Sequence, residues 1–152
     1  MRTVFAAFLS LALASAAWAH EVKAGSLTLS DLQVRAVPAG VPTSAAYLTI
    51  ANAGKAADKL LSVECACASS AMVHETSTKG GISSMSMKSE VTIPAGGKVA
   101  FAPNGLHVML VGMKGGLKAG GMQELTLRFE NAGVVKAGFH VRDVIRAPAA
   151  GR

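Results

Sequence analysis

The stretch VTIPAGGKVAFAPNGLHVMLV, residues 91–111, decides the fold class of this chain. Two turn sequences, Pro94–Gly97 and Pro103–Gly105, divide it into three short apolar runs. Within each run, apolar residues recur at every second position, which is the period of a strand with one buried face. Runs this short, joined by turns this tight, predict antiparallel β-strands and leave no room for a helix.

The same pattern continues on both sides of this stretch. Leu27 and Leu29 alternate with polar residues, and the alternation resumes after a shift of phase near Ser30–Asp31, which predicts two short strands or one bulged strand. The sequence contains no long helical pattern, tandem repeat or interdomain linker. We therefore predict an all-β fold, an antiparallel Greek-key β-sandwich or barrel. Further strands are expected at 46–51, 61–67, 72–80, 82–87, 125–129 and 134–144.

The first 19 residues, MRTVFAAFLSLALASAAWA, have the features of a secretory signal peptide. Arg2 supplies a positive charge, Val4–Ala14 is an apolar stretch, and Ala17–Ala19 has the small-x-small form of a cleavage site. We interpret residues 1–19 as a cleaved signal; the alternative is an uncleaved membrane anchor. The apolar stretch is shorter than the roughly 20 residues that a membrane-spanning helix needs. Residues 20–152 are therefore expected to form a single domain in the periplasm, a monomer without stable membrane insertion.

The charge distribution argues against one large class of partners. The chain carries a formal net charge of +6 at pH 7, from 15 Lys and Arg residues against 9 Asp and Glu. The basic residues are scattered and are not interleaved with the few aromatic residues. A nucleic-acid interface needs a basic patch or stripe, so we expect no nucleic-acid partner. The mild positive charge suits either an acidic protein partner or an ordinary solvated surface.

Two histidines and two methionines follow the spacing His74-x10-Met85-x21-His107-x-Met109. A thioether sulfur is soft and uncharged, so it binds Cu(I) well and Ca²⁺, Mg²⁺ or Mn²⁺ poorly. Zinc sites in proteins use Cys, His and carboxylate ligands. If these four side chains converge, the metal that they are expected to bind is Cu(I).

The strand prediction gives this motif a geometry. His107 and Met109 are two residues apart on one strand, so their side chains leave the same face while their apolar neighbours fill the core. His74 and Met85 lie on either side of Gly80–Gly81, where the chain is able to fold back. We therefore expect a site to which each of the two segments contributes one His and one Met.

Two other methionines leave the sulfur ligand ambiguous. Met87 would share a face with Met85 on an extended segment, so either of them would supply the sulfur. Met72 would share a face with His74, as a supporting residue or a transient ligand. The sequence does not choose between these possibilities.

The two cysteines, Cys65 and Cys67, are separated by one residue and are expected on one strand face with Leu61 and Val63. On an extended strand, residues i and i+2 have Cα atoms near the ~7 Å limit for a disulfide, so a bridge requires the chain to bend. A disulfide, a pair of buried thiols and accessory copper ligands all remain open. A blue-copper centre is not expected, because it needs a trigonal site of two His and one Cys.

The two remaining histidines, His20 and His140, are expected to have different roles. Cleavage after Ala19 would leave His20 with a free amine beside its imidazole, a nitrogen pair suited to Cu(II). His20 is therefore a candidate for a secondary Cu(II) site, with a disordered terminal residue as the alternative. His140, on the last predicted strand, is expected to be a surface or structural residue.

The pattern His-x10-Met-x21-His-x-Met resembles the signature of the PCu(A)C family of periplasmic copper chaperones at every spacing. The stretches AYLTIANAG, MVHET and LTLRFENAG also resemble that family, so the likeness covers nearly the whole mature chain. The resemblance implies a cupredoxin-like β-barrel that binds Cu(I) through His74, Met85, His107 and Met109. It also implies delivery to the CuA centre of cytochrome c oxidase, alongside a Sco-type thioredoxin-fold protein. The end of the chain, RDVIRAPAAGR, lacks the His- and Met-rich extension that holds Cu(II) in some members.

No nucleophile–base–orienter set and no GxSxG or HExxH motif is present, so we expect a carrier and not an enzyme. Two other functions stay open. One is a periplasmic copper-resistance protein that sequesters the metal. The other is a copper oxygenase in which His20 belongs to an N-terminal histidine brace.

Overall fold

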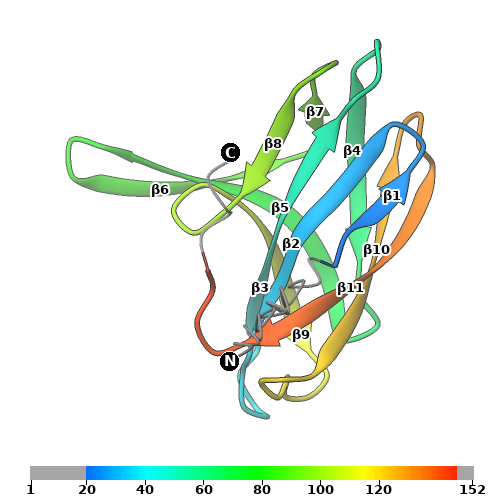
Figure 1. Cartoon of the computed structure of the whole chain (residues 1–152). Helices are drawn as coiled ribbons and strands as arrows, with labels where there is room; N and C mark the ends of the chain where they lie inside the picture. The colour runs from blue at the N-terminus through cyan, green and yellow to red at the C-terminus, as the bar shows by residue number, and fades with distance from the viewer. Residues whose placement is uncertain (1–19, 147–152) are drawn as a thin grey trace, which may run out of the picture.

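The computed structural model describes residues 20–146, which form eleven β-strands and no helix (Figure 1). The signal peptide expected at residues 1–19 lies outside the described residues. Within residues 20–146 there is thus no helix capable of spanning a bilayer. The all-β prediction is confirmed. The strands are β1 (Val22–Ala24), β2 (Leu27–Arg35), β3 (Thr43–Asn52), β4 (Asp58–Glu64), β5 (Ala68–Lys79), β6 (Ile82–Lys88), β7 (Val91–Ile93), β8 (Lys98–Phe101), β9 (Leu106–Met113), β10 (Met122–Phe129) and β11 (Val134–Arg142).

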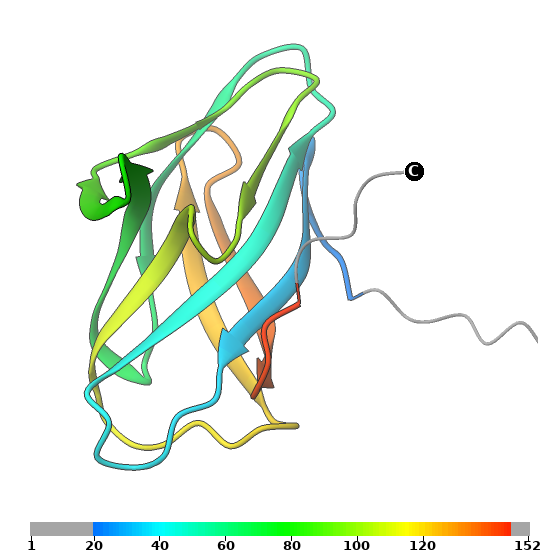
Figure 2. The ribbon, with the colours of Figure 1, turned by 90° about the vertical axis from the view of Figure 1, so that its left-hand side faces the viewer.

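The strands form one hydrogen-bonded sheet in the order β6-β5-β9-β3-β2-β11-β10-β4-β7, with β1 added to β2 and β8 added to β3. The sheet curls until its two halves face each other as two layers, with the open edges β6 and β7 at its ends (Figure 2). One pair of neighbours departs from the antiparallel prediction, because β2 and β11 run parallel with Gln33 opposite His140. The layered β architecture that the alternation predicts is otherwise present.

A single apolar core fills the space between the two layers. Val108 and Leu110 on β9, Leu125 and Leu127 on β10 and Phe139 on β11 are all completely buried. Each such side chain contributes roughly 1.5–3 kcal/mol by leaving water. Because alternate residues of a strand point to opposite faces, burying these positions of β9 turns its other positions to the outer face.

β2 carries the irregularity that the sequence indicates. Its ladder with β3 shifts register between Ser30 and Gln33, and Asp31 has a φ of 53°. Aspartate tolerates this left-handed conformation better than most residues. Its carboxylate also accepts a hydrogen bond of 2.9 Å from Thr49 Oγ1. Of the two interpretations left open, a single bulged strand is the correct one.

β4 differs from its prediction, because it comprises Asp58–Glu64 and not residues 61–67. Its ladder with β10 contains a register shift. Leu61 is consequently 39% exposed, whereas Val63 is buried. The prediction of one shared face for Leu61, Val63 and the two cysteines is therefore wrong, since the irregularity interrupts the alternation.

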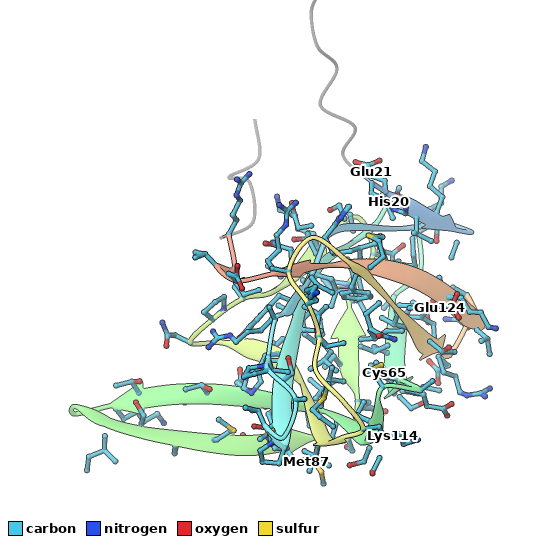
Figure 3. All side chains as sticks on the ribbon, turned by 90° about the horizontal axis from the view of Figure 1, so that it is seen from below. His20, Glu21, Cys65, Met87, Lys114 and Glu124 are labelled. Carbon is cyan, nitrogen blue, oxygen red and sulfur yellow. A yellow bond between two sulfur atoms is a disulfide. The ribbon has the colours of Figure 1, made fainter. Side chains whose placement is uncertain are left out.

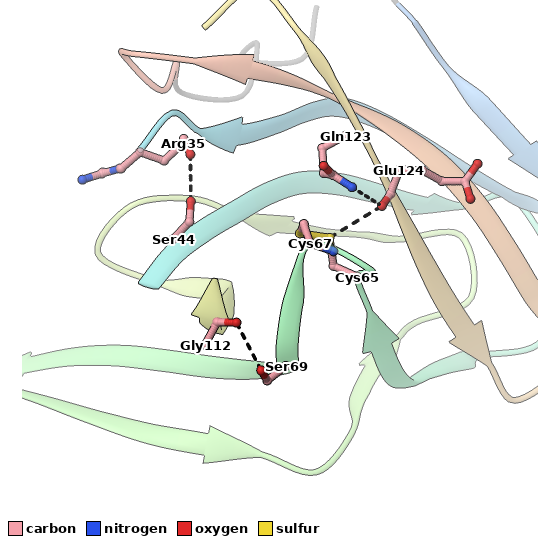
Figure 4. The surroundings of a disulfide bond; sticks show 8 residues. All are labelled: Arg35, Ser44, Cys65, Cys67, Ser69, Gly112, Gln123 and Glu124. Atoms are coloured by element: carbon pink, nitrogen blue, oxygen red, sulfur yellow. Dashed lines mark hydrogen bonds between the residues drawn. A yellow bond between two sulfur atoms is a disulfide. The ribbon is translucent and has the colours of Figure 1, made fainter. Parts of the chain in front are cut away.

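The two cysteines lie in the turn between β4 and β5, where they form a disulfide (Figure 4). The chain bends there, and the Cys65 carbonyl accepts a hydrogen bond of 3.2 Å from the Ala68 N–H. The Cα atoms of Cys65 and Cys67 are 5.1 Å apart, within the range that a disulfide requires. Of the three interpretations left open, the structure has the disulfide, so these sulfurs are not thiolate ligands for copper.

Asp58, at the start of β4, is a buried carboxylate that fastens the β10–β11 turn to this strand. Its oxygens accept backbone hydrogen bonds of 2.7 Å from Lys59 and 2.9 Å from both Asn131 and Ala132. Burial alone raises the pKa of Asp58. The hydrogen bonds from Asn131, Lys59 and Ala132 outweigh burial and lower the pKa below its ordinary value of 3.8.

We predict that Asp58→Asn lowers the free energy of unfolding at pH 7 by about 1–3 kcal/mol, because an amide offers these N–H groups one oxygen instead of two. A depressed folded pKa means that the contribution of the carboxylate is fully present above the unfolded pKa. It is lost as the pH falls through the folded pKa. The difference between the two proteins should therefore shrink below about pH 4. Urea unfolding of the parent and Asp58→Asn proteins at pH 7 and pH 3 measures the loss of stability at each pH. The exposed Asp143→Asn is the control. An equal loss at the two pH values would contradict the proposed contribution of the Asp58 carboxylate.

Candidate metal centre

The candidate site lies on the outer face of β6, β5 and β9. β5 pairs with β9 so that His74 lies directly opposite His107, and Met72 directly opposite Met109. Residues directly opposite each other in an antiparallel ladder project from the same face. The imidazole rings of His74 and His107 accordingly have centroids 5.9 Å apart. The two histidines of the motif, distant in sequence, are neighbours in the structure.

The hairpin of β5 and β6 brings the methionines to the same face, and it projects from the body of the molecule (Figure 1). In its ladder, His74 lies opposite Met87 and Thr76 lies opposite Met85. His74 and Thr76 share a face, so both methionines project from that face. Gly80–Gly81 form the turn with φ values of 57° and 78°, the left-handed pair that a tight hairpin favours. The fold-back expected at these glycines is confirmed.

Three of the four predicted residues line one open cleft of about 460 Å³: Met85, His107 and Met109. The side chain of Met85 is 55% exposed, whereas that of His107 is only 8% exposed. His107 lies on the outer face of β9 as expected, but the walls of the cleft cover it, among them the Pro103–Asn104 turn. The cleft therefore has a buried nitrogen side and an open sulfur side.

A hydrogen bond fixes which nitrogen of His107 is available. His107 Nδ1 lies 3.1 Å from the carbonyl oxygen of Gly105. A carbonyl only accepts, so this contact assigns the proton to Nδ1 and leaves the lone pair on Nε2. Metal-binding histidines are commonly oriented by a partner of this kind on their other nitrogen. His107 is thus oriented to donate through Nε2.

His74 has a ring nitrogen without a partner. Its Nδ1 is buried, and no hydrogen-bond partner for it exists among residues 20–146. An unpaired buried polar atom costs about 1–3 kcal/mol, so a ligand from outside the polypeptide would satisfy it. A metal–nitrogen bond of about 2.0 Å allows two ligating imidazoles a centroid separation of up to about 6 Å. The 5.9 Å between His74 and His107 fits that limit.

The two ambiguous methionines share the face but do not line the cleft. Met87, directly opposite His74, is 67% exposed and lies on the projecting hairpin (Figure 3). Met72, directly opposite Met109, is partly buried. Met85 is therefore the β6 sulfur that shares a cavity with His107.

The donor set is chemically selective. Across residues 20–146, no group of three or more His, Cys, Asp or Glu side chains could hold a metal ion. A metal at this cleft would depend on the imidazole of His107 and on thioether sulfur; His74 does not line the cleft, but its ring lies beside His107 and would supply the second nitrogen of a neutral set that suits Cu(I). Sequence reasoning missed the orienting carbonyl of Gly105 and the wall residues Arg35 and Tyr47. The tight Pro103–Gly105 turn before His107 was the sequence signal that could have indicated the Gly105 carbonyl. No local signal could have indicated Arg35 and Tyr47, because they lie on strands distant in sequence.

Comparison with protein families and curated proteins identifies relatives of this chain. The family described as "Putative lipoprotein LpqE-like" matches residues 27–141. The "Putative lipoprotein Lxx21020" of Leifsonia xyli subsp. xyli is 34% identical over 122 residues, which are 80% of this chain and 72% of that protein.

Similar solved structures are domains of one kind. The copper-bound PCuAC domain from PmoF2 has a TM-score of 0.71 and 26% identity, and the match covers 82% of this chain and 99% of that domain. The solution structure of CuI-DR1885 from Deinococcus radiodurans has a TM-score of 0.63 and 31% identity, and the match covers 88% of this chain and 87% of that protein. The apo form of DR1885 has the same TM-score and 30% identity, and the match covers 97% of this chain and 99% of that protein. The PCuAC neighbours have a cupredoxin-like β fold, which this chain shares.

We predict that Met85→Ala weakens Cu(I) binding by about tenfold or more, whereas Met87→Ala changes it by less than about threefold. Both side chains are exposed on β6, so neither substitution should disturb the fold, and each serves as the control for the other. Competition with a chromophoric Cu(I) chelator measures the affinities. The opposite order of effects would transfer the sulfur ligand to Met87.

Proposed function

Because this chain belongs to the LpqE-like family, which is the PCuAC family, we propose that it is a Cu(I)-binding metallochaperone that acts outside the cytoplasm. The observation that carries the proposal is the meeting of Met85, His107 and Met109 at one cleft, with His74 paired to His107. Two of the similar solved structures are described as copper-bound, one of them with Cu(I), which supports the choice of metal. Copper is the cargo of such a protein.

We assign His74, Met85, His107 and Met109 as the ligands of Cu(I). The free Nε2 of His107 and the unpaired Nδ1 of His74 support the nitrogen ligands. All four donors are neutral, so the site adds no negative charge to stabilise a divalent ion. A recipient that offers thiolates would therefore bind Cu(I) more strongly and draw it away. The secondary Cu(II) binding considered for His20 is not part of this site.

The exposure of the ligands gives transfer a direction. Met85 lies on an edge strand and is more than half exposed, whereas His107 is almost completely buried. An incoming ligand would reach copper from the side of Met85, and the bond to Met85 would be the first to exchange. Copper would then be shared between donor and recipient until His107 and Met109 release it. No bond of a substrate is made or broken, so the proposed protein is a carrier without enzymatic turnover.

The proposed recipient is the subunit of cytochrome c oxidase that carries the CuA centre, with a Sco-type thioredoxin-fold protein as a second partner. Such a dinuclear site contains thiolate ligands, which satisfy the requirement for a stronger acceptor. The formal net charge is +6 for the whole chain and, without Arg2 of the expected signal, +5 for residues 20–152, and it would favour approach to an acidic surface. Export from the cytoplasm is supported by the lipoprotein names of the family and of the Leifsonia relative, and by the form of residues 1–19; the periplasm is the proposed destination.

We predict that His107→Ala weakens Cu(I) binding by about 100-fold or more while the β fold persists. The substitution removes the most deeply buried donor of the site and leaves Val108 and Leu110 in the core. Chelator competition measures the affinity, and far-UV circular dichroism checks the fold. Unchanged affinity in a folded variant would remove the site as described.

Transfer separates a chaperone from a sequestering protein. The Cu(I)-loaded protein, mixed without oxygen with a purified soluble domain that carries the CuA ligands, should lose its copper to that domain. Separation by gel filtration followed by metal analysis measures the distribution. A recipient domain whose CuA cysteines are replaced by serine is the control and should take up none. Retention of copper against the intact domain would favour sequestration.

A further inference from the structure

A second pair of histidines lies away from the copper cleft. The ring centroids of His20 and His140 are 6.0 Å apart, with an angle of 86° between the ring planes. Their separation is almost the same as the 5.9 Å between His74 and His107. His20 lies at the opposite side of the molecule from Met87, which is on the hairpin of the first site (Figure 3). The two pairs of rings are therefore separate places on the surface.

The strand pairing explains why these two histidines meet. β1 pairs with β2 so that Val22 lies opposite Leu29, which places the residues before Val22 beside the bulged part of β2. β11 pairs with the same edge of β2 further along, with His140 opposite Gln33, because β3 occupies the other edge. His20 and His140 therefore approach each other along this one edge of β2, between the segment that pairs with β1 and the segment that pairs with β11.

We propose that His20 and His140 form a second metal site that binds Cu(II). Two imidazoles on one ion are allowed a centroid separation of up to about 6 Å, so the 6.0 Å between these rings lies at that limit. Nitrogen donors suit divalent ions, and Cu(II) binds most strongly of the first-row divalent metals. In a chain cleaved after Ala19, the amine of His20 would add a third nitrogen and close a chelate ring.

We assign no sulfur ligand to this site. Met122 lies directly opposite His140 in the β10–β11 ladder and is 51% exposed. A Cβ at position 138 would lie 2.8 Å from Met122 Cε, so the end of this side chain packs over Gly138. His140 also borders an open cleft of about 350 Å³, whose lining includes Arg142 and Asp143 but not His20. The nitrogen set distinguishes this Cu(II) site from the Cu(I) site of two His and two Met.

The test uses residues 20–152, titrated with copper(II) sulfate and followed by electron paramagnetic resonance. We expect one Cu(II) per chain with nitrogen hyperfine structure, bound about tenfold or more weakly after His20→Ala and after His140→Ala. His20 is exposed and precedes the first strand, so its variant tests the site without a change in the core. Cu(I) affinity, measured by chelator competition, should be unchanged in both variants.

His74→Ala is the matched control, since it should weaken Cu(I) binding and leave the Cu(II) spectrum unchanged. Loss of the Cu(II) signal in this control would place Cu(II) in the first site and overturn the proposal. Equal Cu(II) affinity in the parent, His20→Ala and His140→Ala would reduce the ring contact to aromatic packing and overturn it as well. Neither result would alter the Cu(I) measurements, so this proposal and the chaperone function fail separately.

Discussion

The register of the ladder between β5 and β9 is the constraint on which the copper site depends. A shift of one residue would turn His107 and Met109 into the core and bring Val108 and Leu110 to the cleft, because side chains alternate between faces. Val73 and Val108 lie directly opposite each other and are both buried, which opposes such a shift. The burial that stabilises the sandwich therefore also selects the face on which the nitrogen and sulfur donors gather.

The donors are divided between a fixed part and an accessible part of the molecule. His107 lies on β9, which has β5 on one side and β3 on the other, and its ring is held by the carbonyl of Gly105. Met85 lies on β6, an edge strand in which every residue is exposed. A site built in this way orients the ion through its buried side and exchanges ligands through its open side. The fixed orientation of His107 follows from the inner position of β9 in the sheet, and the accessibility of Met85 follows from the edge position of β6.

Local patterns in the sequence predicted much of this arrangement. Alternation predicted the β architecture, an irregularity near Ser30–Asp31 and the common face of His107 and Met109, because strand faces depend on neighbouring residues. It left open whether the irregularity was a bulge or a break between two strands. Alternation treats Met85 and Met87 alike, and only the walls from distant strands distinguish them. The disulfide needed a bend in the chain, and the β4 boundaries depended on a register shift with β10. The contact of His20 with His140 needed the parallel pairing of β2 and β11, which no local pattern encodes.

That parallel pairing joins two strands more than a hundred residues apart along the chain. Pairing between such distant segments requires a long loop to be closed, which costs entropy and slows folding. The two-layered sheet therefore stays incomplete until β11 has been synthesised. For the export proposed above, this dependence on β11 would leave the fold unfinished until nearly the whole chain has been translocated.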